Sequence, residues 1–236
     1  MRKLLIITMS LLLTLNINAQ SQGKAWSQTI FREVNLKDYP NTAVLGRRCQ
    51  GIVKAVFEAA EKGAPVYKYD MNGHDILDGE SQSTLDKILE DFHLTIQEIP
   101  YTDITTLYVM EQTAYNASNS SFTTDVVAVC PVLLANDDFG VGVTKYPICW
   151  IRLQDARQKL SQLMMTTANN QQYYMSAYEW LALQQYQGSI YKIQNNAGVA
   201  LPQYCSTPEM ISAEQQRIES GLRAIKKQTY QNHLSK

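Results

Sequence analysis

Apolar residues recur at helical spacing in five segments of the chain and alternate, or run together, in five others. Spacings of three and four residues predict helices over 47–62, from Ser83, over 156–164, from Ser176 and from Thr207. Runs rich in β-branched and aromatic residues predict strands over 65–69, 105–115, 122–134, 146–153 and 189–193. Strands and helices are interspersed, and two consecutive strands form an antiparallel hairpin whose second strand is central. The pattern therefore predicts a single α+β domain with a mixed or antiparallel sheet and about five helices packed on it.

Three of these helices begin at residues that favour a helix N-terminus. Ser83 and Asp86 resemble a capping box, and Ser176 and Glu179 form a complete one. Thr207 precedes Pro208, and proline is favoured at the first helical position. The helix that starts there is expected to be long and to end the domain.

The first nineteen residues have the pattern of a secretory signal peptide. Arg2 and Lys3 precede the apolar run 4–15, and the small residue Ala19 follows it. We expect cleavage after Ala19. An uncleaved anchor is the alternative, but a membrane span needs about 20 apolar residues and this run is shorter. Nothing later in the chain is apolar enough to span a membrane.

Residues 20–45 are expected to form a polar N-terminal arm without a core of its own, and residues 46–236 to form the α+β domain. The arm has one amphipathic patch, which contains Trp26 and Phe31. Apolar anchors dominate the energetics of protein interfaces, so we expect these two side chains to pack on a partner or a neighbouring copy. The alternative is that both pack on their own domain.

The composition and charge of the chain exclude several classes of protein. Hydrophobic residues make up 45% of the 236 residues and charged residues 18%, which excludes disorder and suffices for a core. Lys and Arg number 21 against 22 for Asp and Glu, so bulk charge attracts neither nucleic acid nor an anionic membrane. Removal of residues 1–19 leaves 19 basic against 22 acidic residues, a net charge of −3.

Four cysteines in an exported protein permit disulfides, and spacing alone leaves three complete connectivities open. Cys49 on a helix face and Cys149 in an apolar strand are natural places for buried free thiols. Cys130 and Cys205 are better placed for a crosslink. Zinc is disfavoured, because no two cysteines lie two to four residues apart and the three histidines are isolated.

Motifs for catalysis and cofactor binding are incomplete. Gly140 and Gly142 lack the third glycine of a dinucleotide site, because Lys145 occupies its position. The acidic stretch 70–103 fits a solvated face better than calcium, since Asp75 stands where an EF-hand loop requires glycine. We therefore expect no catalytic residue, no cofactor and no metal ligand. A periplasmic enzyme with a cryptic site and a ligand-binding module are the alternative classes.

Several sequence blocks follow one another in a characteristic order: Trp26-Ser27-Gln28-Thr29-Ile30-Phe31-Arg32, Ile88-Leu89-Glu90-Asp91-Phe92-His93, Val129-Cys130-Pro131-Val132-Leu133, Asp138-Phe139-Gly140, Tyr146-Pro147, Gly188-Ser189-Ile190-Tyr191-Lys192, Gln203-Tyr204-Cys205 and Glu214-Gln215-Gln216-Arg217-Ile218-Glu219. In these blocks the chain resembles the GldN/PorN family, a gliding-motility component of the type IX secretion system of Bacteroidetes. The blocks cover most of the chain after the signal peptide.

The resemblance implies a non-catalytic periplasmic structural protein. It implies assembly into a ring with other copies and with the family's outer-membrane lipoprotein, GldK/PorK, which would associate the chain with the outer membrane. It also implies contact with the periplasmic domains of the motor component GldM/PorM. Cys130 and Cys205 both lie in matching blocks, so the resemblance favours a Cys130–Cys205 disulfide, with Cys49 and Cys149 reduced.

Overall fold

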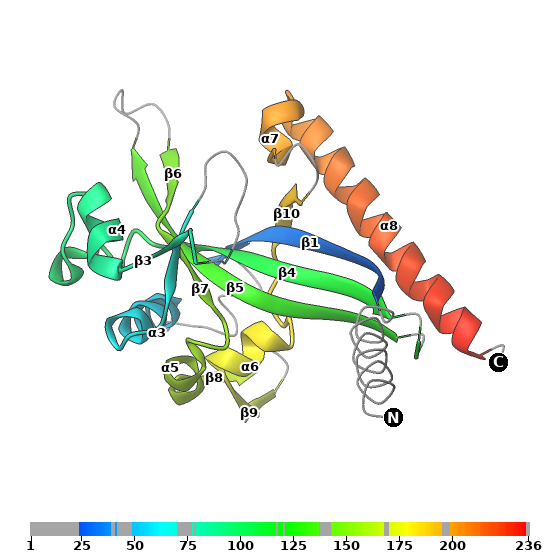
Figure 1. Cartoon of the computed structure of the whole chain (residues 1–236), viewed down its shortest axis with the longest axis horizontal. Helices are drawn as coiled ribbons and strands as arrows, with labels where there is room; N and C mark the ends of the chain where they lie inside the picture. Colours follow the sequence, from blue (N-terminus) through cyan, green and yellow to red (C-terminus); the bar gives the residue numbers. More distant parts are fainter. Residues whose placement is uncertain are drawn as a thin grey trace, which may run out of the picture.

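A large antiparallel sheet is the frame of the protein (Figure 1). The computed structural model describes residues 24–38, 41, 49–69, 77, 79–116, 118–119, 121–136, 143–167, 170–194 and 199–234, so the expected signal peptide lies outside the described residues. The strands of the sheet are β1 (Lys24–Asn35), β2 (Val66–Lys68), β3 (Gln82–Ser83), β4 (Thr106–Asn116), β5 (Ser121–Asn136), β6 (Val143–Pro147), β7 (Cys149–Arg152) and β10 (Ser189–Ile193). Their order is β10-β1-β4-β5-β7-β2-β3, and β6 pairs with β5.

The described residues also form six helices, a short 3₁₀ turn and a separate hairpin of β8 (Met164–Thr167) and β9 (Asn170–Ser176). The helices and the turn η2 are α3 (Cys49–Glu61), α4 (Leu85–Asp91), η2 (Ile96–Glu98), α5 (Arg157–Gln162), α6 (Ala177–Ala182), α7 (Leu201–Tyr204) and α8 (Pro208–Leu234). Strands and helices thus share one α+β domain with an antiparallel sheet, as the sequence pattern predicts.

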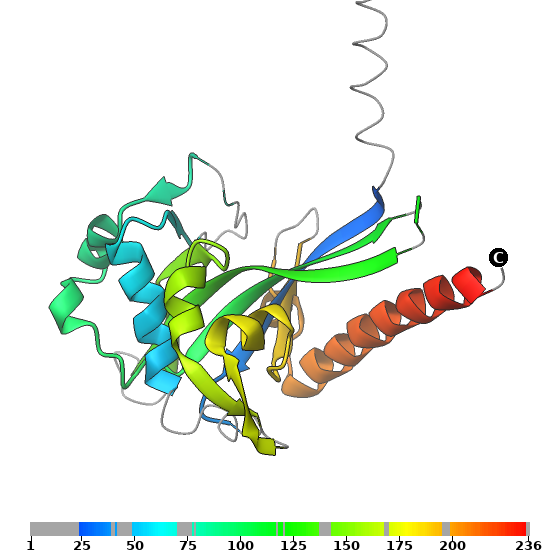
Figure 2. The same ribbon diagram turned by 90° about the horizontal axis from the view of Figure 1, so that it is seen from below.

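Two groups of helices cover one face of the sheet, which we call the helix face (Figure 2). The larger group is α3, α5 and α6, whose buried residues such as Val56, Leu160 and Trp180 share one core cluster with Val34 and Val109 of the sheet. Helix α8 supplies Ile218 to a smaller cluster with Ile30 on β1 and Ile190 on β10. Alternate residues of a strand point to the same face, so Ile30, Arg32 and Val34 line up between the two groups.

Strand β1 lies inside the sheet, between β10 and β4. Ile30, Phe31 and Val34 are each at most 1% exposed, so this segment contributes to three core clusters. The expectation of a coreless arm over 20–45 is therefore wrong for β1. The strand resembles an exposed segment because polar residues such as Arg32 interrupt its apolar positions, although both of its faces are covered.

Local signals locate the helix ends well. Ser176 caps α6 and accepts a hydrogen bond from the backbone N–H of Glu179 at 3.1 Å, while the Glu179 carboxylate accepts one from the Ser176 N–H at 2.8 Å. This capping box is confirmed. Helix α4 starts one residue later than the Ser83 pattern indicates, because Thr84 is its cap. Gln184 follows α6 with a φ of 54°, the left-handed conformation that often ends a helix.

An aromatic cluster, formed by Phe31, Tyr67, Tyr69, Tyr108, Trp150 and Tyr191, lies on the opposite face of the sheet. The ring of Phe31 lies 5.8 Å from that of Trp150 and 6.1 Å from that of Tyr191, measured between centroids. Tyr108 and Tyr191 stack at 4.1 Å. Burial raises the pKa of the Tyr108 phenol well above its usual value. The sheet is therefore buried on both faces near its centre.

Helix α8 has 27 residues and is about 40 Å long at 1.5 Å per residue. Ile211, Ile218 and Leu222 pack on the domain, and the Gln215 side chain donates a hydrogen bond to the Ile190 carbonyl at 2.7 Å. These contacts lie between Ile211 and Leu222. The C-terminal end of the helix extends away from the sheet (Figure 2).

Candidate functional site

A polar cleft of about 750 Å³ opens between the sheet and α8. Strand β1, strand β4, the loop that enters β10, and α8 line it. Its ionisable side chains include Arg32, Glu111, Tyr186, Glu219 and Arg223. The cleft thus lies between α8 and the segment that follows α6.

Arg32 and Glu111 form a buried ion pair at the floor of the cleft. Arg32 on β1 lies opposite Val109, so Glu111, two residues further along β4, is its diagonal neighbour on the same face. The Arg32 Nε lies 2.9 Å from both carboxylate oxygens of Glu111. The Glu111 side chain is 3% exposed and that of Arg32 is 16% exposed. Each charge has lost most of its water, so each depends on the other for compensation.

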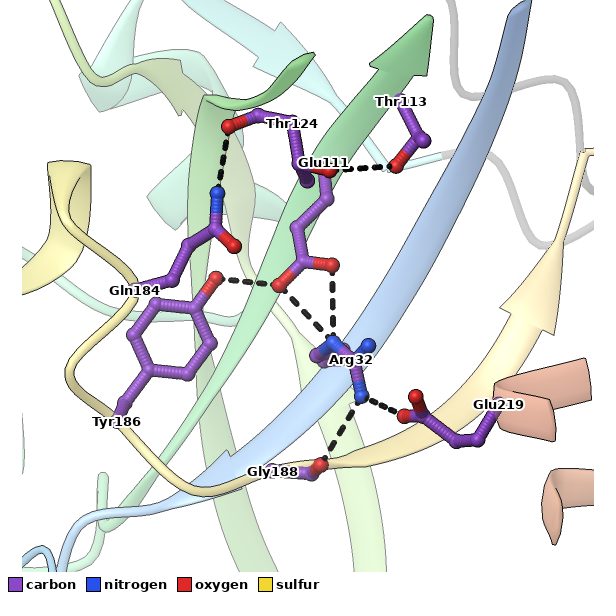
Figure 3. Close-up of polar contacts among 8 residues, drawn as sticks. All are labelled: Arg32, Glu111, Thr113, Thr124, Gln184, Tyr186, Gly188 and Glu219. Atoms are coloured by element: carbon purple, nitrogen blue, oxygen red, sulfur yellow. Dashed lines mark hydrogen bonds and ion pairs between the residues drawn. The ribbon is translucent and has the colours of Figure 1, made fainter. Parts of the chain in front are cut away.

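Three further groups complete this network (Figure 3). The Tyr186 hydroxyl donates a hydrogen bond to Glu111 Oε1 at 2.6 Å. The Arg32 Nη1 donates to the Gly188 carbonyl at 3.4 Å and to the Glu219 carboxylate on α8. We call Arg32, Glu111, Tyr186 and Glu219 the Arg32 clamp, because they join β1, β4, the loop before β10 and α8.

The protonation states of the clamp follow from burial and pairing. Burial raises the pKa of the Tyr186 phenol well above its usual value, and the negative charge of Glu111 raises it further, so the phenol stays a donor. Burial alone would lower the pKa of Arg32. The charges and hydrogen bonds of Glu111 and Glu219 outweigh it and raise that pKa, so the guanidinium stays charged.

The loop before β10 is held from both sides. The Asn41 amide donates hydrogen bonds of 2.8 Å to the Asn35 and Gln187 carbonyls, and its oxygen accepts one from the Gln187 N–H. The Gln184 amide donates to the Thr124 carbonyl at 2.6 Å, and the hydroxyls of Thr124 and Thr113 lie 3.2 Å apart (Figure 3). The polar groups of the cleft thus fasten segments of the domain to one another.

This arrangement favours a structural role for the cleft. Catalysis needs a nucleophile, a base and a charge-stabilising group that converge on open space. In the Arg32 clamp the phenol is a protonated donor and the carboxylate of Glu111 is occupied by Arg32 and Tyr186. The contacts of the clamp instead fix the position of α8 against the sheet.

Gly188 packs closely against β1, and replacing it with alanine is expected to lower the free energy of unfolding by about 1–3 kcal/mol. A Cβ at this position would lie 2.7 Å from Val34 Cγ2 and 2.8 Å from the Glu33 carbonyl oxygen, so backbone must shift. The measurement is chemical denaturation of both proteins.

The matched control is the same substitution at Gly221, inside α8. A Cβ there meets nothing within 4 Å, and alanine is a better helix former than glycine. Gly221→Ala is expected to raise the free energy of unfolding by about 0.5–1 kcal/mol. Equal effects at the two positions would contradict the close approach of Gly188 to β1.

The two expected interface residues lie in different surroundings. Phe31 is buried in the aromatic cluster, and the Lys192 ammonium lies 4.6 Å from its ring centroid. It packs on its own domain, which is the alternative considered from the sequence. Trp26 is partly exposed and stacks on Phe122, with 6.4 Å between ring centroids. Of the two residues, only Trp26 has an exposed part of its side chain that a partner could contact.

The expected Cys130–Cys205 disulfide is not formed in the structure. Cys130, Cys149 and Cys205 are buried and have reduced thiols. Cys130 points into the aromatic cluster from β5, whereas Cys205 ends α7. Burial raises the pKa of the Cys149 thiol to about 12, which keeps it protonated and unreactive, as expected for a packed free cysteine.

Sequence patterns did not identify the Arg32 clamp. Its charged members are separated by 79 and 187 residues along the chain, and no spacing rule links them. Arg32 and Glu219 each lie at the end of a block that resembles the GldN/PorN family, Trp26–Arg32 and Glu214–Glu219. A charged residue inside an otherwise buried strand was the signal that a compensating charge had to be near.

Within the described part of the chain, no three His, Cys, Asp or Glu side chains gather in a way that could hold a metal ion. None of the described helices combines the length and the apolar character needed to cross a bilayer.

Comparison with known proteins identifies the family. The profile of the family described as gliding motility associated protein GldN matches residues 20–231, nearly the whole chain. No curated protein matches the chain. The match includes β1, the Arg32 clamp and most of α8, so both the sheet side and the helix side of the cleft fall within it. On this extent of match, the chain belongs to the GldN family of gliding motility associated proteins.

Proposed function

We propose that this chain is a non-catalytic structural component of the type IX protein secretion and gliding machinery. Membership of the GldN family carries the proposal. In this function the chain assembles into a ring with other copies and with a GldK/PorK-like outer-membrane lipoprotein. It also contacts the periplasmic domains of a GldM/PorM-like motor component.

The proposal includes export and removal of residues 1–19, which gives a periplasmic protein held at the outer membrane by its lipoprotein partner. The basic start, short apolar run and Ala19 support this location.

The structure of the cleft supports an assembly role rather than an enzymatic one. In the Arg32 clamp, two carboxylates, a phenol and a guanidinium form the contacts that join α8 to the sheet. A protein that carries partners needs such rigid attachment of its projecting elements, because a loosely held element adds an entropic cost to binding.

Tyr186→Phe separates the assembly role from a catalytic role of the cleft. The variant keeps the aromatic side chain at position 186 but loses the hydroxyl that donates a hydrogen bond to Glu111. We therefore expect the free energy of unfolding to fall by about 1.5–3 kcal/mol. Cells that carry the variant in place of the natural chain should still glide and secrete. Loss of both activities while the variant accumulates in folded form would contradict the assembly role and favour an enzyme or a ligand-binding module.

A further inference from the structure

The second half of α8 forms a positively charged groove with the sheet. A groove of about 120 Å³ lies between the helix and the helix face, and its lining residues include Phe122, Leu222, Arg223 and Lys226. The Arg32 clamp contributes Arg32, Glu111 and Glu219 to the same lining, so three basic side chains stand against two acidic ones. From Leu222 to Leu234 the helix carries Arg223, Lys226 and Lys227 and no acidic residue. Arg223 and Lys226 are exposed and make no ion pair within the described residues.

The sheet side of this groove contains Phe122, which belongs to a row of aromatic side chains beside the groove. Trp26 lies opposite Tyr115 on β4, and Tyr115 lies opposite Phe122 on β5, so the three rings form one row across the strands. All three are partly exposed, and Phe122 lines the groove. Aromatic and arginine side chains together are typical of protein interfaces.

The opposite end of the molecule has the complementary character. The surface around α4 and η2, residues 79–103, has six carboxylates and one basic residue, Lys87. Asp86 and Glu90 are exposed one helical turn apart on α4, and Phe92, Leu94 and Ile96 beside them are only partly buried. Helix α4 lies at one end of the longest axis and the C-terminus of α8 at the other (Figure 1).

We propose that the groove beside the second half of α8 binds the α4–η2 surface of a second copy of this chain. Positive and aromatic groups on one side meet negative and apolar groups on the other, which is the complementarity that steers and orients protein contacts. The two surfaces differ and lie at opposite ends, so the contact runs head to tail and a pair of copies keeps one free surface of each kind. Repetition of such a contact builds a ring or a filament. This inference deepens the proposed function by naming the contact between copies.

Two charge reversals test the contact. Asp86→Lys with Glu90→Lys changes the net charge of α4 from −2 to +2, and Arg223→Glu with Lys226→Glu changes that of residues 222–234 from +3 to −1. Each double variant alone should associate at least about tenfold more weakly than the natural chain, because attraction becomes repulsion. An equimolar mixture of the two variants should associate again, since reversed α4 meets reversed α8 and natural α4 meets natural α8. Sedimentation velocity on the full mature chain gives the dissociation constants.

A change of ionic strength and charge reversals outside the two surfaces provide the controls. Raising the ionic strength from about 0.05 M to about 0.5 M should weaken association of the natural chain, because the Debye length shortens several-fold. Asp155→Lys and Lys54→Glu reverse exposed charges away from both surfaces and should leave association unchanged. Thermal unfolding of every variant reports whether it is folded.

Three outcomes overturn the contact. They are a natural chain that stays monomeric at low salt, folded variants that associate like the natural chain, and a mixture that fails to regain association. If association is lost in one variant only, the groove or the α4–η2 surface binds something other than its proposed counterpart, which also overturns the contact. The same variants isolated from cells distinguish this failure from that of the function, because a chain that binds the lipoprotein but not its own copies contradicts only the head-to-tail contact.

Discussion

Replacing Glu111 with alanine should lower the free energy of unfolding by about 3–5 kcal/mol, because it leaves the buried guanidinium of Arg32 without its closest countercharge. The side chain of Glu111 is 3% exposed and accepts hydrogen bonds from both Arg32 and Tyr186. Two buried donors therefore lose their acceptor at once, and each lost bond adds a desolvation cost. Urea denaturation followed by circular dichroism measures the change.

Two comparisons separate the buried pair from the rest of the clamp. Glu219→Ala removes the other carboxylate of Arg32, but that side chain is 30% exposed, so the expected loss is about 1 kcal/mol. Arg32→Met combined with Glu111→Leu replaces both charges with apolar groups of similar size. This double variant should be more stable than Glu111→Ala, because no unpaired charge stays buried. A Glu111→Ala loss no larger than that of Glu219→Ala would contradict the buried ion pair.

Phe31→Ala is expected to cost about 3–5 kcal/mol of unfolding free energy, as truncation of a fully buried aromatic residue does. The residue is 1% exposed, and its ring contacts Trp150 and Tyr191 in the aromatic cluster. Removal of the ring leaves a cavity that the sheet cannot close without moving β1. Thermal and chemical denaturation both report this loss.

Trp26→Ala is the matched control for Phe31→Ala, since both residues lie on β1 and in the same sequence block. Trp26 is partly exposed and has one aromatic stacking partner, Phe122, so the expected cost is about 0.5–1.5 kcal/mol. If Phe31→Ala leaves the unfolding midpoint unchanged, then Phe31 belongs to an interface and β1 is not part of the core.

Local sequence signals predicted the elements, whereas contacts between distant segments required the structure. Caps and apolar spacing act within a few residues, which is why α3 spans nearly its predicted range and α6 and α8 begin at the predicted positions. The hairpin of β4 and β5 was predicted for the same reason, because its strands are joined by a short polar turn.

Strand β1 shows why the remainder could not be predicted. Arg32 makes the segment polar, and its charge is stable inside the sheet only because it pairs with Glu111. That partner lies 79 residues further along the chain. Sequence spacing carries no information about that pairing, so the sequence pattern predicts an arm for this segment. The Cys130–Cys205 expectation failed similarly, because a preference for loops and strand ends does not determine where the two thiols lie in space.

Isolation of the tagged full-length chain from envelope fractions tests the central claim, that the chain acts by assembling with protein partners. Mild crosslinking before extraction preserves weak contacts, and a tagged chain with Glu111→Ala provides the comparison with a destabilised fold. We expect the natural chain to be recovered with further copies of itself and with an outer-membrane lipoprotein of the GldK/PorK kind. Recovery of the folded natural chain without either partner, from cells that glide and secrete, would contradict the claim.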